Sequence, residues 1–149
     1  MASKPKRALS GWLRRNDWAL YETATQAIEE RDAFAEGVSE VKKSQLRAVL
    51  NTARMCPRPG AFEHFVEKRK DRREKEARQS DDEGLRKRAE FWGALEDHVG
   101  QILEDYATPA IEEITEETGG ADPKVETAQM RVLRAYLEHF ISHCHVKSR

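Results

Sequence analysis

Long apolar runs are absent from this sequence, and their absence argues against a membrane-spanning protein. No stretch approaches the roughly 20 apolar residues that an α-helix needs to cross a bilayer. The N-terminal residues MASKPKRALSGW also lack the apolar segment of a signal peptide. We therefore expect a cytoplasmic protein with no membrane partner.

Cysteine is nearly absent as well. The chain has two cysteines, Cys56 and Cys144, which are far apart and lack the spacing of a disulfide framework. A disulfide-stabilised scaffold is therefore excluded, and we expect reduced thiols. Cys144 falls on an apolar helix face, which predicts a place in the core.

Residues that favour β-strands are sparse, whereas Ala, Glu, Arg, Lys and Leu dominate the composition. This balance argues against a sheet and predicts an all-α fold. The 149 residues, of which 38% are hydrophobic, suit one helical domain over residues 1–149 with a modest core. Apolar residues recur at three- and four-residue steps in separate stretches, so we expect a helical bundle of five to six helices.

Residues that start or end helices separate the first of these stretches. The first helix is expected to run from Ser10 or Asn16 to Gly37, because glycine readily takes the backbone conformation that ends a helix. The second is expected to begin with a cap at Ser44 and to end at the break that Pro57 introduces.

The second half of the chain holds the longest apolar stripes. A stripe over residues 85–106 predicts a helix of about six turns at 3.6 residues each. The Thr-Pro pair at 108–109 predicts a helix restart with a bend, and the Gly-Gly pair at 119–120 predicts the end of that piece. The Asp-Pro pair at 122–123 predicts the start of a last helix. Its apolar stripe consists of Val125, Val132, Leu133, Tyr136, Leu137, Phe140, Ile141 and Cys144.

One segment resists this interpretation. Residues 67–84, EKRKDRREKEARQSDDEG, are highly charged and offer almost nothing to bury, although Phe62, Phe65 and Val66 precede them on an apolar face. Two interpretations stay open: a solvent-exposed helix or a linker.

The net charge of −1 conceals a strong separation of sign along the chain. Residues 41–60 hold five basic residues and no acidic one, whereas residues 79–130 hold fourteen acidic residues and four basic ones. Separated charges allow two faces to meet different partners, but they can also neutralise each other across a bundle. Both interpretations stay open.

The stretch VKKSQLRAVLNTARM, residues 41–55, combines an apolar helix face with an acid-free basic remainder. A backbone phosphate needs only positive donors at a suitable spacing, so this segment predicts a nucleic-acid interface. No exposed aromatic residue lies among the basic ones, which indicates recognition of shape and charge rather than stacking on bases. The candidate residues are Lys42, Lys43, Arg47, Arg54 and Arg58.

Motifs for catalysis are missing. The sequence GGADP contains two glycines, but it follows an expected helix rather than a strand, so it does not fit a phosphate-binding loop. The glutamates at 112–117 have no paired histidines, which argues against a di-iron bundle. We therefore expect a protein that is not an enzyme and that has no cofactor.

One cluster, HFISHCH, contains residue types that bind metals. His139 and His143 are four residues apart and share a helix face, with Cys144 and His145 beside them. Zinc or nickel would suit such ligands. Cys144, however, belongs to the apolar stripe and His145 points elsewhere on the helix, so we favour histidines that interact with the helix dipole and expect no metal.

Two segments resemble a known family. Residues 43–47, KSQLR, open an expected helix, and the last helix reads MRVLRAYLEHFISHCHVK. Together they resemble the small helical subunit of type III-A CRISPR interference complexes, which has a Ser-Gln-Ile/Leu-Arg start to an early helix and an aromatic-rich terminal helix. The match covers about a fifth of the chain, residues 41–54 and 132–146.

This resemblance implies a non-catalytic subunit of an antiviral ribonucleoprotein complex. Such a subunit stacks in several copies along guide and target RNA, beside the other subunits, and contacts the RNA backbone without sequence specificity. Lys43 and Arg47 lie in the matching motif, whereas Arg54 follows from the charge pattern alone.

Two other functions remain as alternatives. One is a helical protein-interaction adaptor or homodimer, whose basic and acidic faces bind each other between copies. The other is a metal-dependent enzyme with its site on the terminal helix.

Overall fold

A computed structural model describes residues 4–120 and 124–148. This part of the chain contains helices and no strand, so the predicted all-α bundle is confirmed. α5, the π-helical turn η2 and α6 follow one another without a break, which leaves six separate helical rods among the described residues. In chain order the elements are α1 (Lys4–Glu30), α2 (Asp32–Gly37), the 3-10 turn η1 (Val38–Glu40), α3 (Lys43–Met55), α4 (Pro59–Arg78), α5 (Glu83–Ile102), η2 (Leu103–Ala107), α6 (Thr108–Glu117) and α7 (Val125–Lys147).

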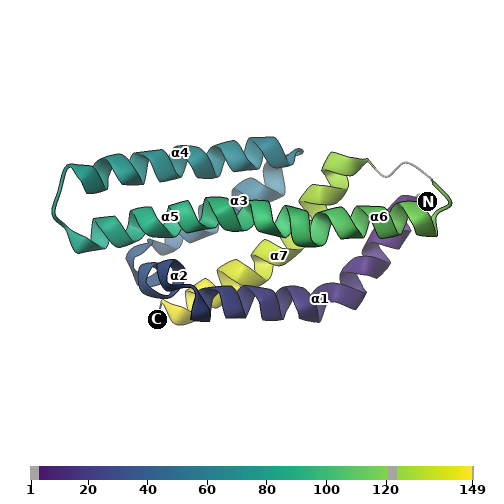
Figure 1. The fold of residues 1–149 in the computed structure, drawn as a ribbon, viewed down its shortest axis with the longest axis horizontal. Coiled ribbons are helices and arrows are strands. Elements are labelled where there is room, and N and C mark those ends of the chain that lie inside the picture. Colours follow the sequence, from purple (N-terminus) through teal and green to yellow (C-terminus); the bar gives the residue numbers. More distant parts are fainter. Residues whose placement is uncertain (1–3, 121–123, 149) are drawn as a thin grey trace.

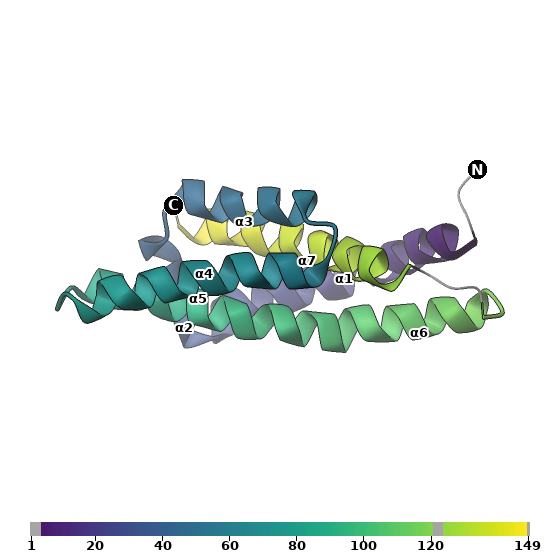
Figure 2. The same cartoon turned by 90° about the horizontal axis from the view of Figure 1, so that it is seen from above.

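The helices form an elongated bundle (Figure 1). α4 and α5 make an antiparallel hairpin, and α5 continues through η2 into α6 as one long rod. α7 crosses behind this rod and packs along α1. Seen from above, α3 lies on one flank beside α7, and the rod lies on the opposite flank (Figure 2). α1 and α3 are therefore both attached to α7.

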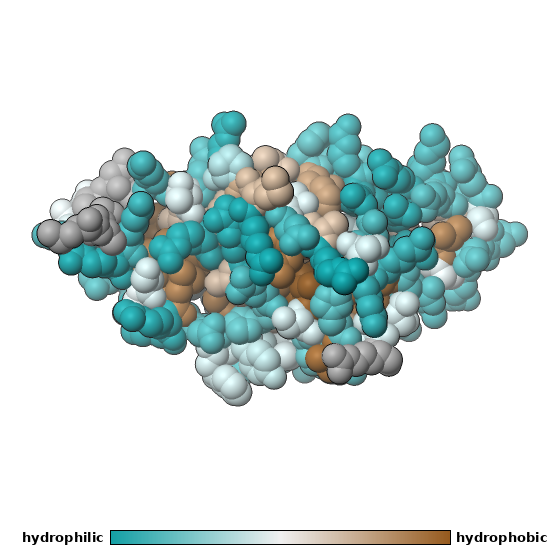
Figure 3. Space-filling view, turned by 180° about the vertical axis from the view of Figure 1, so that it is seen from behind, coloured by the Kyte–Doolittle hydropathy of each residue, from teal (hydrophilic) through white to brown (hydrophobic). Residues whose placement is uncertain are grey.

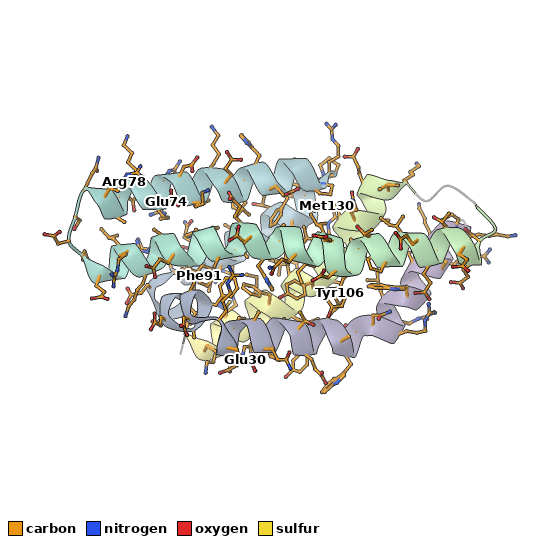
Figure 4. The ribbon with its side chains drawn as sticks, in the orientation of Figure 1. Glu30, Glu74, Arg78, Phe91, Tyr106 and Met130 are labelled. Carbon is orange, nitrogen blue, oxygen red and sulfur yellow. The ribbon has the colours of Figure 1, made fainter. Side chains whose placement is uncertain are left out.

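The core consists of two clusters with shared neighbours. In the larger one, the Phe34 ring meets the rings of Phe91 and Phe140 edge-on, at centroid distances of 5.3 and 5.1 Å. Phe91 and Tyr106 lie on the side of the rod that faces α1 (Figure 4), and Tyr106 with Leu13 packs against both clusters. The smaller cluster joins the start of α1 to α6 and α7, and it consists of Leu9, Trp12, Ala107, Ala110, Ile114, Ala128 and Val132.

α1 starts earlier than predicted. It is helical from Lys4, ahead of the expected start at Ser10 or Asn16. The reason is tertiary, because Leu9, ahead of the expected start, is buried in the smaller cluster together with Trp12. Leu9 is the single large apolar residue before Ser10, which was too little to predict these turns.

The predicted continuation of the first helix to Gly37 is also wrong. Arg31 has extended dihedral angles, φ −86° and ψ 115°, and separates α1 from α2. Its guanidinium lies 5.3 Å from the centre of the Phe34 ring and 3.7 Å from the carboxylate of Asp97. Phe34, which follows the break, is fully buried in the core.

Two other helix starts differ from the prediction. Ser44 does not cap α3, because Lys42 holds the N-cap position with extended backbone angles and makes no side-chain cap bond. α5 begins at Glu83 rather than at Leu85. The carboxylate of Asp82 caps it by accepting a hydrogen bond of 3.2 Å from the backbone N–H of Leu85.

The Thr-Pro pair at 108–109 does not interrupt the rod. The N–H of Thr108 bonds to the carbonyl of Leu103, five residues earlier, which is the π-helical pattern of η2. Proline has no N–H to offer a carbonyl in the preceding turn, and the wider turn accommodates this loss. The predicted end of α6 is confirmed: Gly119 and Gly120 have positive φ values of 69° and 88°.

The predicted start of the last helix at 122–123 lies outside the described residues. α7 begins at Val125, whose side chain is 45% exposed, so Val125 does not belong to the buried stripe as predicted. The helix reaches the core only at Ala128, the first of its buried residues. The rest of the predicted stripe is buried, including Cys144.

The charged run at 67–84 is mostly helical. α4 extends to Arg78 and packs along α5, residues 79–82 form the connection, and α5 begins within the run. Lys70 of α4 donates a 3.1 Å hydrogen bond to the carboxylate of Glu96 on α5. The two helices are thus held together by polar contacts as well as by the few apolar residues of α4.

Replacing Phe140 with Ala should reduce the free energy of unfolding by about 3 to 5 kcal/mol, because its ring is fully buried against Phe34 and Tyr136. Urea denaturation measures this change. Ser142→Ala, at an exposed position of α7, is the control and should stay within about 0.5 kcal/mol of the parent. Equal unfolding midpoints for the two variants would contradict the burial.

The core also contains one buried ionisable pair, in which the Nε2 atom of His98 bonds to the hydroxyl of Tyr136. Burial lowers the pKa of His98 from 6.5 to about 4. Between pH 6.5 and pH 4, His98 therefore binds a proton in the unfolded chain but not in the folded chain. Its contribution to the free energy of unfolding is complete above pH 6.5 and decreases as the pH falls toward 4.

We expect the titration of His98 to reduce the free energy of unfolding by about 2 kcal/mol when the pH is lowered from 7.5 to 5. Urea denaturation at the two pH values measures this change. His98→Gln removes the titrating ring and should flatten that part of the profile. His64→Gln, at an exposed site on α4, should leave the profile as it is. A parental slope that persists in His98→Gln would contradict the assignment.

Candidate nucleic-acid interface

α3 presents one face to the protein and the other to solvent. Its apolar residues Leu46, Val49 and Ala53 are fully buried, and the helix packs mainly on α7. The opposite face lies on the flank of the bundle (Figure 2). The amphipathic pattern therefore turns the basic residues of α3 outward.

The first three of the five predicted residues are exposed, and the structure gives them no ion-pair partner within the described ranges. Lys42, Lys43 and Arg47 are exposed to solvent at the start of α3. No residue within the described ranges forms an ion pair with any of them. Their charges are thus available to an external anion without breaking a contact in the protein.

The other two predicted residues are exposed but already have acidic neighbours. Arg54 lies 3.5 Å from the carboxylate of Glu138, and Arg58 lies 4.0 Å from that of Glu126. Exposed ion pairs of this kind contribute about 0 to 1 kcal/mol, so a phosphate can replace the carboxylate. The structure therefore divides the five residues into two groups. The open group, without ion pairs, is Lys42, Lys43 and Arg47, and the paired group is Arg54 and Arg58.

The other end of α3 is attached to α7 by Arg134, which the sequence did not indicate. Its Nε donates a 2.7 Å hydrogen bond to the carbonyl of Ala53, and its terminal nitrogen donates a 2.8 Å bond to that of Cys56. A cation suits the negative end of a helix, where carbonyl groups lack partners. This cap fixes the direction in which the basic face points.

α4 adds a second basic element that the sequence alone did not reveal. The guanidinium of Arg69 donates to the side-chain carbonyl of Gln45 on α3 and lies 5.2 Å from the centre of the Phe65 ring. Its pKa is lowered by burial and by the positive charges of Arg72 and Arg73. Positive charge therefore gathers on α4 next to the start of α3. The run at 67–84 gave no such signal, because it holds seven acidic and seven basic residues.

The space-filling view from behind shows hydrophilic side chains over most of the surface, with apolar colour mainly along its middle (Figure 3). This side of the protein therefore offers little continuous apolar surface for a flat hydrophobic interface. It suits contacts made by charge and hydrogen bonding.

His139 and His143 of the histidine cluster face carboxylates of α1. His139 Nε2 lies 2.8 Å from a carboxylate oxygen of Asp17, and His143 Nε2 lies 2.9 Å from one of Glu29. Glu29 also accepts a 2.9 Å bond from Lys147, and the hydrogen bonds from Lys147 and His143 lower the pKa of Glu29. The two imidazoles thus join α7 to α1.

The remaining metal-type residues do not complete a site. Cys144 is buried, and burial raises the pKa of its thiol, which disfavours the thiolate that metals bind. Among the residues that the structure describes, no group of three or more histidine, cysteine or acidic side chains is placed to hold a metal ion.

Comparison with known proteins identifies no relative. No family model matches the chain, and neither a curated protein nor a solved structure is significantly similar to it. Within the described residues, no helix combines the length and apolarity needed to cross a membrane.

Removing divalent metals with a chelator should leave the melting temperature unchanged, because the His139 and His143 imidazoles have carboxylate partners. Differential scanning calorimetry with and without EDTA measures this. Apo protein with added zinc serves as the second sample. A large decrease in melting temperature with EDTA, restored by zinc, would show that the cluster is a metal site.

Proposed function

We propose that this protein is a non-catalytic helical subunit that binds the RNA backbone without sequence specificity. The observation that carries the proposal is the open group Lys42, Lys43 and Arg47, three exposed cations at the start of the acid-free helix α3 that have no ion-pair partner within the described residues. Binding RNA phosphates to such cations releases condensed counterions, which makes the free energy of binding favourable and dependent on salt.

More specifically, we propose the role of the small subunit in a type III-A CRISPR interference complex, stacked in several copies along guide and target RNA. The support is the resemblance of the KSQLR segment at 43–47 and of the last helix to that family, together with the helical fold. Lys43 and Arg47 belong to the resembling motif and also to the open group, so two independent lines point to the same side chains.

Replacing Lys43 and Arg47 with Ala should weaken binding about equally for unrelated RNA sequences, because phosphate contacts do not read bases. Each lost contact should reduce the slope of log affinity against log salt by about 0.7 for single strands. Fluorescence anisotropy of labelled RNA over a salt series measures both quantities. Arg54→Ala should have a smaller effect, since Arg54 is partly neutralised by Glu138.

The matched control is Arg7→Ala, which removes one exposed charge that forms no ion pair within the described residues, in the first turns of α1 beside the end of α6. Its affinity and salt slope should equal those of the parent. All variants should unfold within about 0.5 kcal/mol of the parent, because the substituted side chains are exposed. A folded Lys43→Ala/Arg47→Ala variant that binds RNA with unaltered affinity and salt slope would contradict the proposal.

An adaptor or homodimer is the second candidate, and the acidic surface of α6 favours it. This helix carries four exposed glutamates, and within the described residues only one of them forms an ion pair, with Arg15 at 3.1 Å. Their charge can complement the basic face of another copy. In that case the Lys43 and Arg47 substitutions would abolish self-association in sedimentation experiments and leave RNA binding unchanged. The four residues are Glu112, Glu113, Glu116 and Glu117.

A further inference from the structure

α1 carries a tryptophan, Trp18, that is exposed to solvent although the protein buries its other tryptophans. Trp18 is 67% exposed, whereas the other two tryptophans, Trp12 and Trp92, are buried. Tyr21, one turn further along α1, is 40% exposed. Large aromatic rings usually bury most of their area, and those left in solvent are frequently binding surfaces.

The two exposed rings form an ordered pair rather than two separate side chains. Their centroids are 5.2 Å apart, with an angle of 33° between the ring planes. Tyr21 also meets the edge of the His139 ring at 5.7 Å, and His139 is itself held by Asp17. The pair is thus supported from α7, while Trp18 at its outer end remains accessible.

An uncommitted cation lies beside this pair. Arg14 is exposed and precedes Trp18 by four residues, so the two side chains are neighbours on the same helix face. Arg15 pairs with Glu113, but Arg14 forms no ion pair with any residue in the described ranges. Glu22 follows Trp18 by four residues and makes the other side of the ring unfavourable for a phosphate.

The aromatic pair and the basic helix flank the same element. In α7, His139 contacts Tyr21 of α1, and the preceding residue, Glu138, contacts Arg54 of α3. Two helix-to-helix spacings, on the order of 20 Å in total, therefore separate the pair from α3. A single polynucleotide strand is long enough to meet both.

We propose that Trp18 is a stacking site for an unpaired base of single-stranded RNA, and that Arg14 binds the adjacent phosphate. This inference rests on the proposed RNA-binding function and extends it from α3 to α1. An aromatic ring and a nearby guanidinium are the combination that binds single strands without reading their sequence. A base can reach the indole only when it is not paired in a duplex, so the site distinguishes single-stranded from double-stranded RNA.

Tryptophan fluorescence tests this directly, because Trp18 is the exposed indole of the three. Titration with oligouridylate should quench and shift the emission as bases stack on Trp18. An abasic oligonucleotide of the same length and charge is the control, and it should bind through its phosphates with little quenching. Equal quenching by both ligands, or none by either, would overturn the stacking site.

Binding measurements with variants provide the second arm. Trp18→Leu should weaken binding to single-stranded RNA about tenfold and leave binding to a duplex of the same length unchanged. Trp18→Phe retains a ring and should recover part of the loss, and Arg14→Ala should reduce the salt slope for the single strand. The control Val146→Ala shortens an exposed apolar side chain near the end of α7 and should have no effect.

The outcomes separate this inference from the function on which it rests. If Lys43→Ala/Arg47→Ala weakens binding to both RNA forms while Trp18→Leu changes neither, the backbone interface stands and the stacking site is wrong. If Trp18→Leu disrupts self-association but not RNA binding, the aromatic pair is a protein contact and the inference is wrong. If the parent binds neither form, both proposals fail together.

Discussion

The burial of α7 is the constraint on which the rest of the structure depends. Its apolar side chains from Ala128 to Cys144 are covered by α1, α3 and the α5–α6 rod, so no single neighbour completes the core alone. Polar contacts then fix the two outer helices on it: Arg134 caps the end of α3, and His139 and His143 bond to acids of α1. Because α1 and α3 each bury one face against α7, the opposite face of each helix is exposed to solvent.

The separation of charge along the chain therefore becomes a separation in space. At the end of α3 that Arg134 caps, Arg54 lies near a carboxylate of α7. At the start of α3, Lys43 and Arg47 are exposed to solvent, and no described acidic side chain forms an ion pair with them. The interpretation that opposite charges cancel across the bundle thus describes one end of this helix, and the open end is where an external anion would bind.

Repetitive features of the sequence were sufficient to predict the fold class and the basic face of α3, because burial of an amphipathic helix depends on a local period. Features that depend on distant partners were not predictable. The break at Arg31 places Phe34 in the core, and Arg69 meets Gln45 across two helices. Trp18 lies off the stripe of Trp12, Leu20 and Ala24, so the helical period itself leaves its side chain uncovered. The period could not predict that Trp18 packs on Tyr21, or that His139 of α7 supports this pair.

Lysine footprinting tests the central claim, that the start of α3 binds RNA phosphates, most directly. Acetylation rates measured by mass spectrometry, with and without saturating oligouridylate at low salt, report how accessible each amine is. We predict strong protection of Lys42 and Lys43 in the complex, and unchanged rates at Lys4, which is exposed in the first turn of α1, beside the end of α6. Unchanged acetylation of Lys42 and Lys43 in protein that is saturated with RNA would contradict the account.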